Sequence, residues 1–83
     1  MKTVLITGAS GGIGAATARL FAQNGYRVAL DYFRSKEAAV SLERELGKNA
    51  FAVKADVSDS AQVKAMFQSV QQRFGGIDVL INN

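Results

Sequence analysis

Short apolar runs alternate with longer amphipathic stretches along the whole chain. Four runs have the length and composition of strands: residues 4–6, 28–30, 51–53 and 79–81. Between them apolar residues recur at helical spacing, and a glycine follows each stretch (Gly25, Gly47 and Gly75), where a left-handed helix cap would lie. The alternation predicts the order β-α-β-α-β-α-β, and therefore a parallel sheet with right-handed crossovers.

Each amphipathic stretch has one face that we expect to pack against the sheet. The expected faces are Ile13, Ala16, Thr17, Leu20 and Phe21; Ala39, Leu42 and Leu46; and Val63, Met66, Phe67, Val70 and Phe74. Ser35 and Ser58 are candidate N-caps of the second and third helices, with Asp59 in the first turn of the third. Right-handed crossovers place the first two helices on one face of a doubly wound, Rossmann-like α/β sheet with strand order 3-2-1-4, and the third on the other.

Length and composition limit the possibilities further. The 83 residues suffice for one domain, spanning residues 1–83, and a last apolar run that ends at Asn82 and Asn83 without a covering helix suggests a truncated half of such a domain. The absence of cysteine and histidine argues against disulfides, most zinc sites and histidine catalysis, so no metal site is expected. Ten basic and seven acidic residues form no clustered basic face for nucleic acid, and no apolar stretch reaches the ~20 residues of a membrane span. We expect a cytoplasmic protein.

A glycine-rich segment, residues 7–14 (TGASGGIG), joins the first strand to the first helix. A strand that turns sharply into a helix gathers unpaired backbone amides and the positive end of the helix dipole at one point, which suits a phosphate. Gly8 permits the tight turn, Gly12 lets a pyrophosphate approach the backbone, and Gly14 allows close packing of helix on strand. The spacing is neither the GxGxxG fingerprint nor a P-loop. A turn that serves packing alone is the alternative.

This segment resembles the TGxxxGxG motif of the short-chain dehydrogenase/reductase family, and the resemblance covers all 83 residues. Asp56 and Val57 match the family's acidic residue that contacts the adenine amino group and the backbone amide after it. Asn82 and Asn83 match the first half of the family's NNAG motif. All three motifs follow predicted strands, at whose carboxyl ends open α/β sheets bind their ligands. Within the family, the pattern is most similar to 3-oxoacyl-acyl-carrier-protein reductases and glucose dehydrogenases.

The resemblance implies the NAD(P)-binding portion of an oxidoreductase that acts on a small carbonyl or alcohol. The candidate cofactor-binding residues are Gly8, Ser10, Gly11, Gly12, Ile13, Gly14, Tyr32, Arg34, Ser35, Asp56, Val57 and Asn82. Three residues of the matched motifs could have a structural role and no role in cofactor binding. Asp56 could begin the cap of the third helix, Asn82 could serve nearby backbone groups, and Thr7 could be purely structural.

The residues after the second strand bear on the choice between NADP and NAD. An acidic residue there binds the ribose 2′-hydroxyl of NAD, and a basic residue accommodates the 2′-phosphate of NADP. Asp31 lies at about the expected distance in the sequence after Gly8 for the acid that binds the ribose. By resemblance, however, the family's ribose-binding acid aligns with Tyr32. Residues 34–36 (Arg-Ser-Lys) stand where a helix start and two cations could hold a phosphate. We expect NADP(H) in preference to NAD(H), although Gly12 stands where many NADP-using relatives carry a basic residue; a solvated helix start is the alternative.

By resemblance, the family's catalytic serine, tyrosine and lysine would lie beyond residue 83, so no catalytic residue is expected here and the 83 residues alone should be inactive. Tyr32 and Lys36 have the YxxxK spacing, but at the end of the second strand they would lie over the adenosine half of the cofactor. Substrate would bind only with the missing half, and the full-length protein is expected to be a homo-oligomer. The alternative is a non-catalytic truncated module that binds a nucleotide or pairs with another chain through its fourth strand. A methyltransferase or a flavodoxin-like receiver would need a different loop after the first strand.

Overall fold

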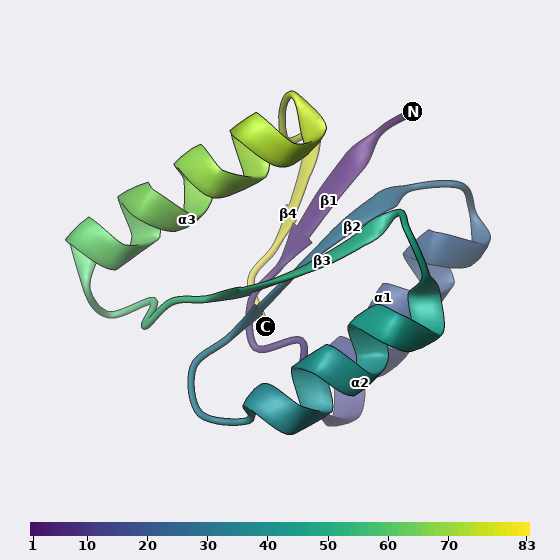
Figure 1. The fold of residues 1–83 in the computed structure, drawn as a ribbon, viewed down its shortest axis with the longest axis horizontal. Helices are drawn as coiled ribbons and strands as arrows, with labels where there is room; N and C mark the ends of the chain where they lie inside the picture. Colours follow the sequence, from purple (N-terminus) through teal and green to yellow (C-terminus); the bar gives the residue numbers. More distant parts are fainter.

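The computed structural model describes residues 1–83 as a four-stranded parallel sheet with helices on both faces (Figure 1). The strands are β1 (Thr3–Ile6), β2 (Arg27–Tyr32), β3 (Ala50–Lys54) and β4 (Val79–Ile81), and the helices are α1 (Gly12–Gln23), α2 (Lys36–Leu46) and α3 (Ser60–Phe74). The spatial order β3-β2-β1-β4 confirms the predicted fold class and strand order. Because every strand pair is parallel, all carboxyl ends lie on one side of the sheet, called here the carboxyl edge.

Two hydrophobic layers cover the sheet, because successive residues of a strand point to opposite faces. On one face, Ile6 belongs to a cluster with Ala18 of α1 and Leu42 of α2. On the other face, Leu5 belongs to a cluster with Val70 of α3. The predicted division of the helices, two on one face and one on the other, is therefore confirmed (Figure 1).

The face that α1 turns toward the sheet differs from the predicted one. The buried residues of α1 are Gly14, Ala15 and Ala18. Ile13 and Leu20, which we expected to be buried, are 77% and 58% exposed. Phe21 packs at the margin of the first cluster, as predicted, but small residues and not Ile13 or Leu20 form the buried face, which lets the helix lie close to the strands.

The faces of α2 and α3 largely follow the prediction. Their buried residues are Ala39, Leu42, Met66, Val70 and Phe74. Leu46 and Val63 pack at the margins of the two clusters. Phe67 remains 36% exposed.

The three helices begin in different ways. Asp59, rather than the predicted Ser58, caps α3, and its carboxylate accepts hydrogen bonds from two first-turn amides. Ser35 precedes α2 as predicted, but its side chain makes no capping hydrogen bond. Helix α1 starts after Gly11, and no side chain caps it. The first amides of α1 are therefore left without a side-chain acceptor.

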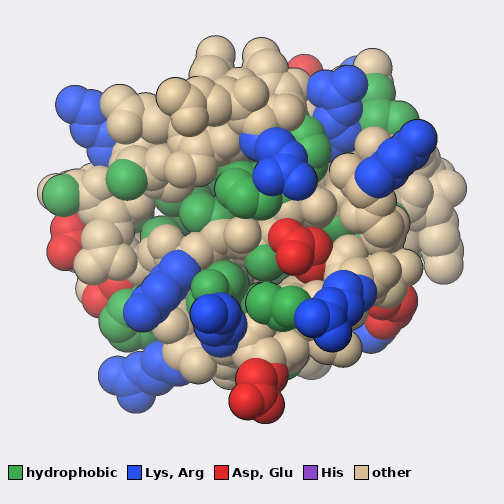
Figure 2. All heavy atoms as spheres, in the orientation of Figure 1, with side chains coloured by type: hydrophobic (Ala, Val, Ile, Leu, Met, Phe, Trp, Pro, Cys, Tyr) green, Lys and Arg blue, Asp and Glu red, His purple; other side chains and the backbone are tan.

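Charged side chains are spread over the face seen in Figure 2, with Lys and Arg interspersed among Asp and Glu. Hydrophobic side chains are visible in the middle of this view, between α3 above and α2 below. No helix of the chain combines the length and the apolar character needed to cross a bilayer.

Candidate functional site

The ends of β2 and β4 hold the glycine-rich loop between them at the carboxyl edge. After β4, Asn83 donates its backbone amide to the Thr7 hydroxyl and its side-chain amide to the Gly8 carbonyl oxygen, each over 3.0 Å. At the end of β2, the carbonyl oxygen of Asp31 accepts a hydrogen bond from the Ala9 amide at 2.9 Å. The loop is thus fixed by backbone and side-chain groups of both strands that flank β1.

Three glycines are required by the path of this loop. Gly8 and Gly12 have φ values of +60° and +51°, in the left-handed region that side chains rarely adopt. A Cβ on Gly14 would lie 2.5 Å from the Gly8 carbonyl oxygen and 2.9 Å from Nδ2 of Asn83. The structure gives Gly8 and Gly14 the turn and packing roles that the sequence predicted.

The middle of the loop faces open space. A Cβ built on Gly11 or Gly12 would have no atom within 4 Å. Ser10 is partly exposed, and the side chain of Ile13 projects into solvent. Neither a capping side chain nor an acidic residue occupies the first turn of α1. An anion can therefore approach these amides, and the helix dipole favours it there.

The carboxyl group of Asp31 lies against the start of the loop and is almost fully buried, with 3% exposure. Its Oδ2 accepts a long hydrogen bond, 3.4 Å, from the Gly8 amide, and its Oδ1 has no partner. Burial raises the pKa of Asp31 above its usual range, opposed by the Gly8 and Ala55 amides and assisted by the charge of Asp56. From the sequence, Asp31 was considered only as a ligand of the cofactor ribose, and its burial was not predicted. The available signal was its position directly after the apolar residues 28–30 of the second strand.

The residues predicted near the cofactor ribose differ in accessibility. Tyr32 is 9% exposed and offers little surface to a ligand. Arg34 and Ser35 are exposed, and the Arg34 guanidinium lies 5.7 Å from the centroid of the Phe33 ring. The accessible part of this segment is therefore the Arg-Ser pair that precedes α2.

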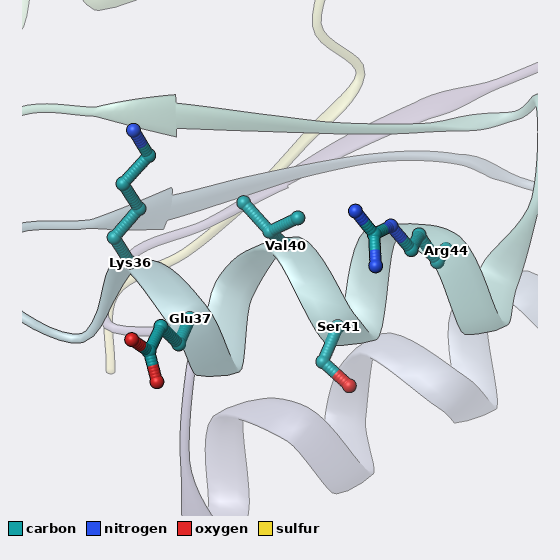
Figure 3. A pocket seen from close by; sticks show the side chains of 5 residues that line it. All are labelled: Lys36, Glu37, Val40, Ser41 and Arg44. Carbon is teal, nitrogen blue, oxygen red and sulfur yellow. The ribbon is translucent and has the colours of Figure 1, made fainter.

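A surface depression at the start of α2 is lined by Arg34, Ser35, Lys36, Glu37 and Ala38. A second depression follows the same helix, with Lys36 at its first turn and Arg44 at its last turn (Figure 3). The first depression brings two cations to the N-terminus of a helix. Such a place suits a phosphate group.

Asp56 lies in the turn after β3. Its carboxylate accepts hydrogen bonds from the hydroxyl of Ser58 at 2.7 Å and from the amide of Ser58 at 3.0 Å. These hydrogen bonds lower the pKa of Asp56, and Arg34 contributes by its charge. Asp59 is the N-cap of α3, but the Asp56 amide donates to Oε1 of Gln62 at 2.9 Å, so Asp56 also belongs to the turn that leads into the helix, in agreement with its structural alternative. Val57 is 53% exposed beside it.

Asn82 lies at the end of β4, where its Oδ1 accepts a hydrogen bond from the Thr7 hydroxyl at 3.2 Å. Thr7 is 6% exposed and also accepts the Asn83 amide through the same hydroxyl oxygen. These contacts agree with the structural alternatives for Asn82 and Thr7. They join β4 to the loop.

Comparison with known proteins places the chain in a family. Residues 2–83 match the sequence model of the short chain dehydrogenase family. The chain is 46% identical to the 3-oxoacyl-[acyl-carrier-protein] reductase FabG of Staphylococcus aureus, over 99% of this chain and 35% of that protein. It is 44% identical to the oxidoreductase YgfF of Escherichia coli, over 100% of this chain and 35% of that protein.

A solved structure has the same arrangement. The crystal structure of the 3-ketoacyl-(acyl-carrier-protein) reductase of Brucella melitensis, complexed with NADH, superposes with a TM-score of 0.90 at 39% identity, over 95% of this chain and 32% of that one. The chain therefore spans about a third of the length of these relatives. With the family pattern matched from residue 2 to residue 83, the chain belongs to the short chain dehydrogenase family.

Proposed function

We propose that the chain binds a nicotinamide dinucleotide at its carboxyl edge, as the cofactor-binding portion of an oxidoreductase that acts on a small carbonyl or alcohol. The observation that carries the proposal is the open, uncapped glycine start of α1 at the ends of parallel strands. The reductases named among its relatives, one of them complexed with NADH, support the same assignment.

The diphosphate of the cofactor binds the backbone of the loop. Residues 10–13 form the exposed rim of the loop, with open space at Gly11 and Gly12. Gly8 and Gly14 act indirectly, since they give the loop its turn and its close contact with the strands. Asn82 holds the loop from the β4 side through Thr7.

The adenosine half lies toward β2 and β3. Asp56 and the backbone of Val57 bind the adenine, with the Asp56 carboxylate kept ionised by the donors of Ser58. Tyr32 lies below the ribose at the end of β2. Because its side chain is buried, it contributes through the position of the strand end more than through its hydroxyl.

NADP(H) is the favoured cofactor over NAD(H). Arg34 and Ser35, with Lys36, offer two charges, a hydroxyl and a helix start to a 2′-phosphate. When bound, the dinucleotide supplies the hydride. The residues of this chain bind and orient it, and none of them is assigned an acid or base role.

Replacement of Ile13 by aspartate tests dinucleotide binding at the loop. The side chain is 77% exposed, so its loss removes little core packing, and an acid in the first turn is compatible with the helix. The new carboxylate would occupy the helix N-terminus and repel the diphosphate. We expect Ile13→Asp to weaken NADPH binding about tenfold or more, measured by NADPH fluorescence.

Ile13→Asn is the matched control, because it has nearly the same shape without the charge. It should bind NADPH within about threefold of the unmodified protein, since it adds no repulsion. Equal affinity of the aspartate and asparagine variants would contradict a diphosphate site at the start of α1.

A further inference from the structure

The carboxyl group of Asp31 lacks the partners that buried carboxyl groups usually have. Buried carboxylates are normally paired with a cation or surrounded by hydrogen-bond donors. Asp31 is 3% exposed, its only hydrogen bond is the long one from the Gly8 amide, and Oδ1 has no partner, although the Ala55 amide also favours its charged form. Such a group needs an explanation beyond packing.

Asp31 contacts the loop through both its side chain and its main chain. Its carboxyl oxygen faces the Gly8 amide, and its carbonyl oxygen accepts the Ala9 amide at 2.9 Å. Gly8 is the left-handed turn that redirects the chain toward the start of α1. Asp31 is thus tied to the residues that set the direction of the loop.

No cation compensates the carboxylate from the surrounding elements. Residues 3–18, which include β1, the loop and the first half of α1, contain no charged side chain, and neither do the residues of β4 or the two asparagines after it. Asp56, after β3, acts on Asp31 with a like charge. Arg34 acts on Asp56, and Lys54 and Lys64 on β3 and α3 are exposed.

We propose that Asp31 is a positioning residue that couples the charge at the base of the glycine-rich loop to dinucleotide binding, so that the protein binds its cofactor more tightly with this carboxyl protonated. The inference rests on the proposed function, because it needs an anionic ligand at the loop. A diphosphate there and an ionised Asp31 carry charges of the same sign in a poorly solvated place. Each therefore disfavours the other.

The direction of the pH dependence follows from linkage. If bound diphosphate makes ionisation of Asp31 harder, ionisation of Asp31 must weaken the diphosphate by the same factor. Burial already raises the pKa of this carboxyl in the free protein. Affinity should therefore fall as the pH rises from the ordinary aspartate range, about 4, through the raised native value.

The test compares Asp31→Asn with the unmodified protein. Asparagine keeps an oxygen acceptor for the Gly8 amide and cannot ionise. NAD⁺ is the probe, because the 2′-phosphate of NADP titrates near pH 6 and would add a pH dependence of its own. Its dissociation constant is measured by calorimetry from about pH 4, the ordinary aspartate pKa, to about pH 8. Glu45→Gln, which removes an exposed acid near the end of α2 and outside the depression at the helix start, is the matched control.

We expect NAD⁺ binding to weaken roughly fivefold or more across this range in the unmodified protein and in Glu45→Gln, and to change much less in Asp31→Asn. An identical pH dependence in all three proteins would overturn the proposal while leaving the proposed function intact. Absence of both NAD⁺ and NADPH binding at every pH would overturn the proposed function, and the coupling with it.

A second measurement uses only the unmodified protein, so it does not require that Asp31→Asn folds. The carboxyl carbon of Asp31 is followed by NMR during a pH titration of the unmodified protein, with and without saturating NAD⁺. We expect the midpoint of its titration to lie higher with NAD⁺ bound. The same midpoint in both samples would show that the two charges do not interact, and would overturn the coupling even if Asp31→Asn failed to fold.

Discussion

The side-chain amide of Asn83 and the carbonyl oxygen of Gly8 are joined by a 3.0 Å hydrogen bond directly beside Gly14. The end of β4, the turn after β1 and the first turn of α1 therefore meet with no room for a further atom. This contact lies under the exposed rim of the loop. The shape of the rim depends on it.

Gly14→Ala should disrupt this contact. The new Cβ would lie 2.5 Å from the Gly8 carbonyl oxygen, which is backbone and cannot rotate away. We expect a loss of about 1–3 kcal/mol in unfolding free energy, measured by urea denaturation, together with weaker NADPH binding. Gly11→Ala is the control, because Gly11 has extended backbone and no atom within 4 Å of a Cβ. Equal stability of the two variants would argue against close packing at Gly14.

Arg34→Ala should reduce the preference for NADP over NAD. Loss of a charged hydrogen bond to a phosphate costs about 1.5–3 kcal/mol, which corresponds to a roughly ten- to hundredfold weaker NADPH affinity. NADH, which lacks the 2′-phosphate, should bind almost unchanged. Arg44→Ala removes the same charge from the last turn of α2 and serves as the control. A parallel loss of NADH and NADPH affinity in Arg34→Ala would contradict the assignment of the 2′-phosphate to this segment.

Glu43→Ala should destabilise the protein at β3, the edge strand that Glu43 contacts. The carboxylate of Glu43 on α2 accepts a hydrogen bond from the Ala52 amide at 2.7 Å, and β3 is an edge strand of the sheet. Removal leaves a partly buried donor without its acceptor, so we expect a loss of about 1–3 kcal/mol by thermal or urea unfolding. Glu43→Gln retains an acceptor oxygen and should recover part of the loss. No difference between alanine and glutamine would show that the hydrogen bond contributes nothing.

Asp31→Asn should change how stability depends on pH. A carboxyl with a raised native pKa keeps its proton in the folded state after the unfolded chain has lost it, so stability falls as the pH rises from about 3.9 through the native value. Asparagine does not have this dependence. We expect the variant to unfold at a higher temperature than the unmodified protein at neutral pH, with the gap narrowing toward about pH 4. A gap independent of pH would contradict a raised pKa in the folded state.

Periodicity predicted the elements and their order. Apolar runs of strand length, with helical spacing between them, reflect local chemistry and the faces that are buried, and the connection rules then fix the handedness of the crossovers. The order β3-β2-β1-β4 came with the doubly wound fold class and not with these rules. The turn at Gly8 and the close approach at Gly14 were predicted for the same reason. A glycine is visible in the sequence, and its lack of a side chain is what permits the turn and the close contact.

The inward face of α1 could not be predicted from hydrophobicity. Ile13 and Leu20 carry large apolar side chains and are exposed, yet Gly14 and Ala18 are buried. The distance between helix and sheet decides which residues fit, and this distance depends on the loop contacts with β2 and β4. A repeat of small residues at positions 14, 18 and 22 was the signal available in the sequence.

The sequence by itself determined the α/β class and the glycine loop, because these follow from patterns within a few residues of each other. Only the tertiary structure decided the environment of individual polar groups. Asp31 is one acid among seven in composition, and its burial against the Gly8 amide arises because β2 and β1 end side by side. Solvation and charge depend on neighbours distant in the chain, so the ionisation behaviour of such a group appears only once the chain is folded.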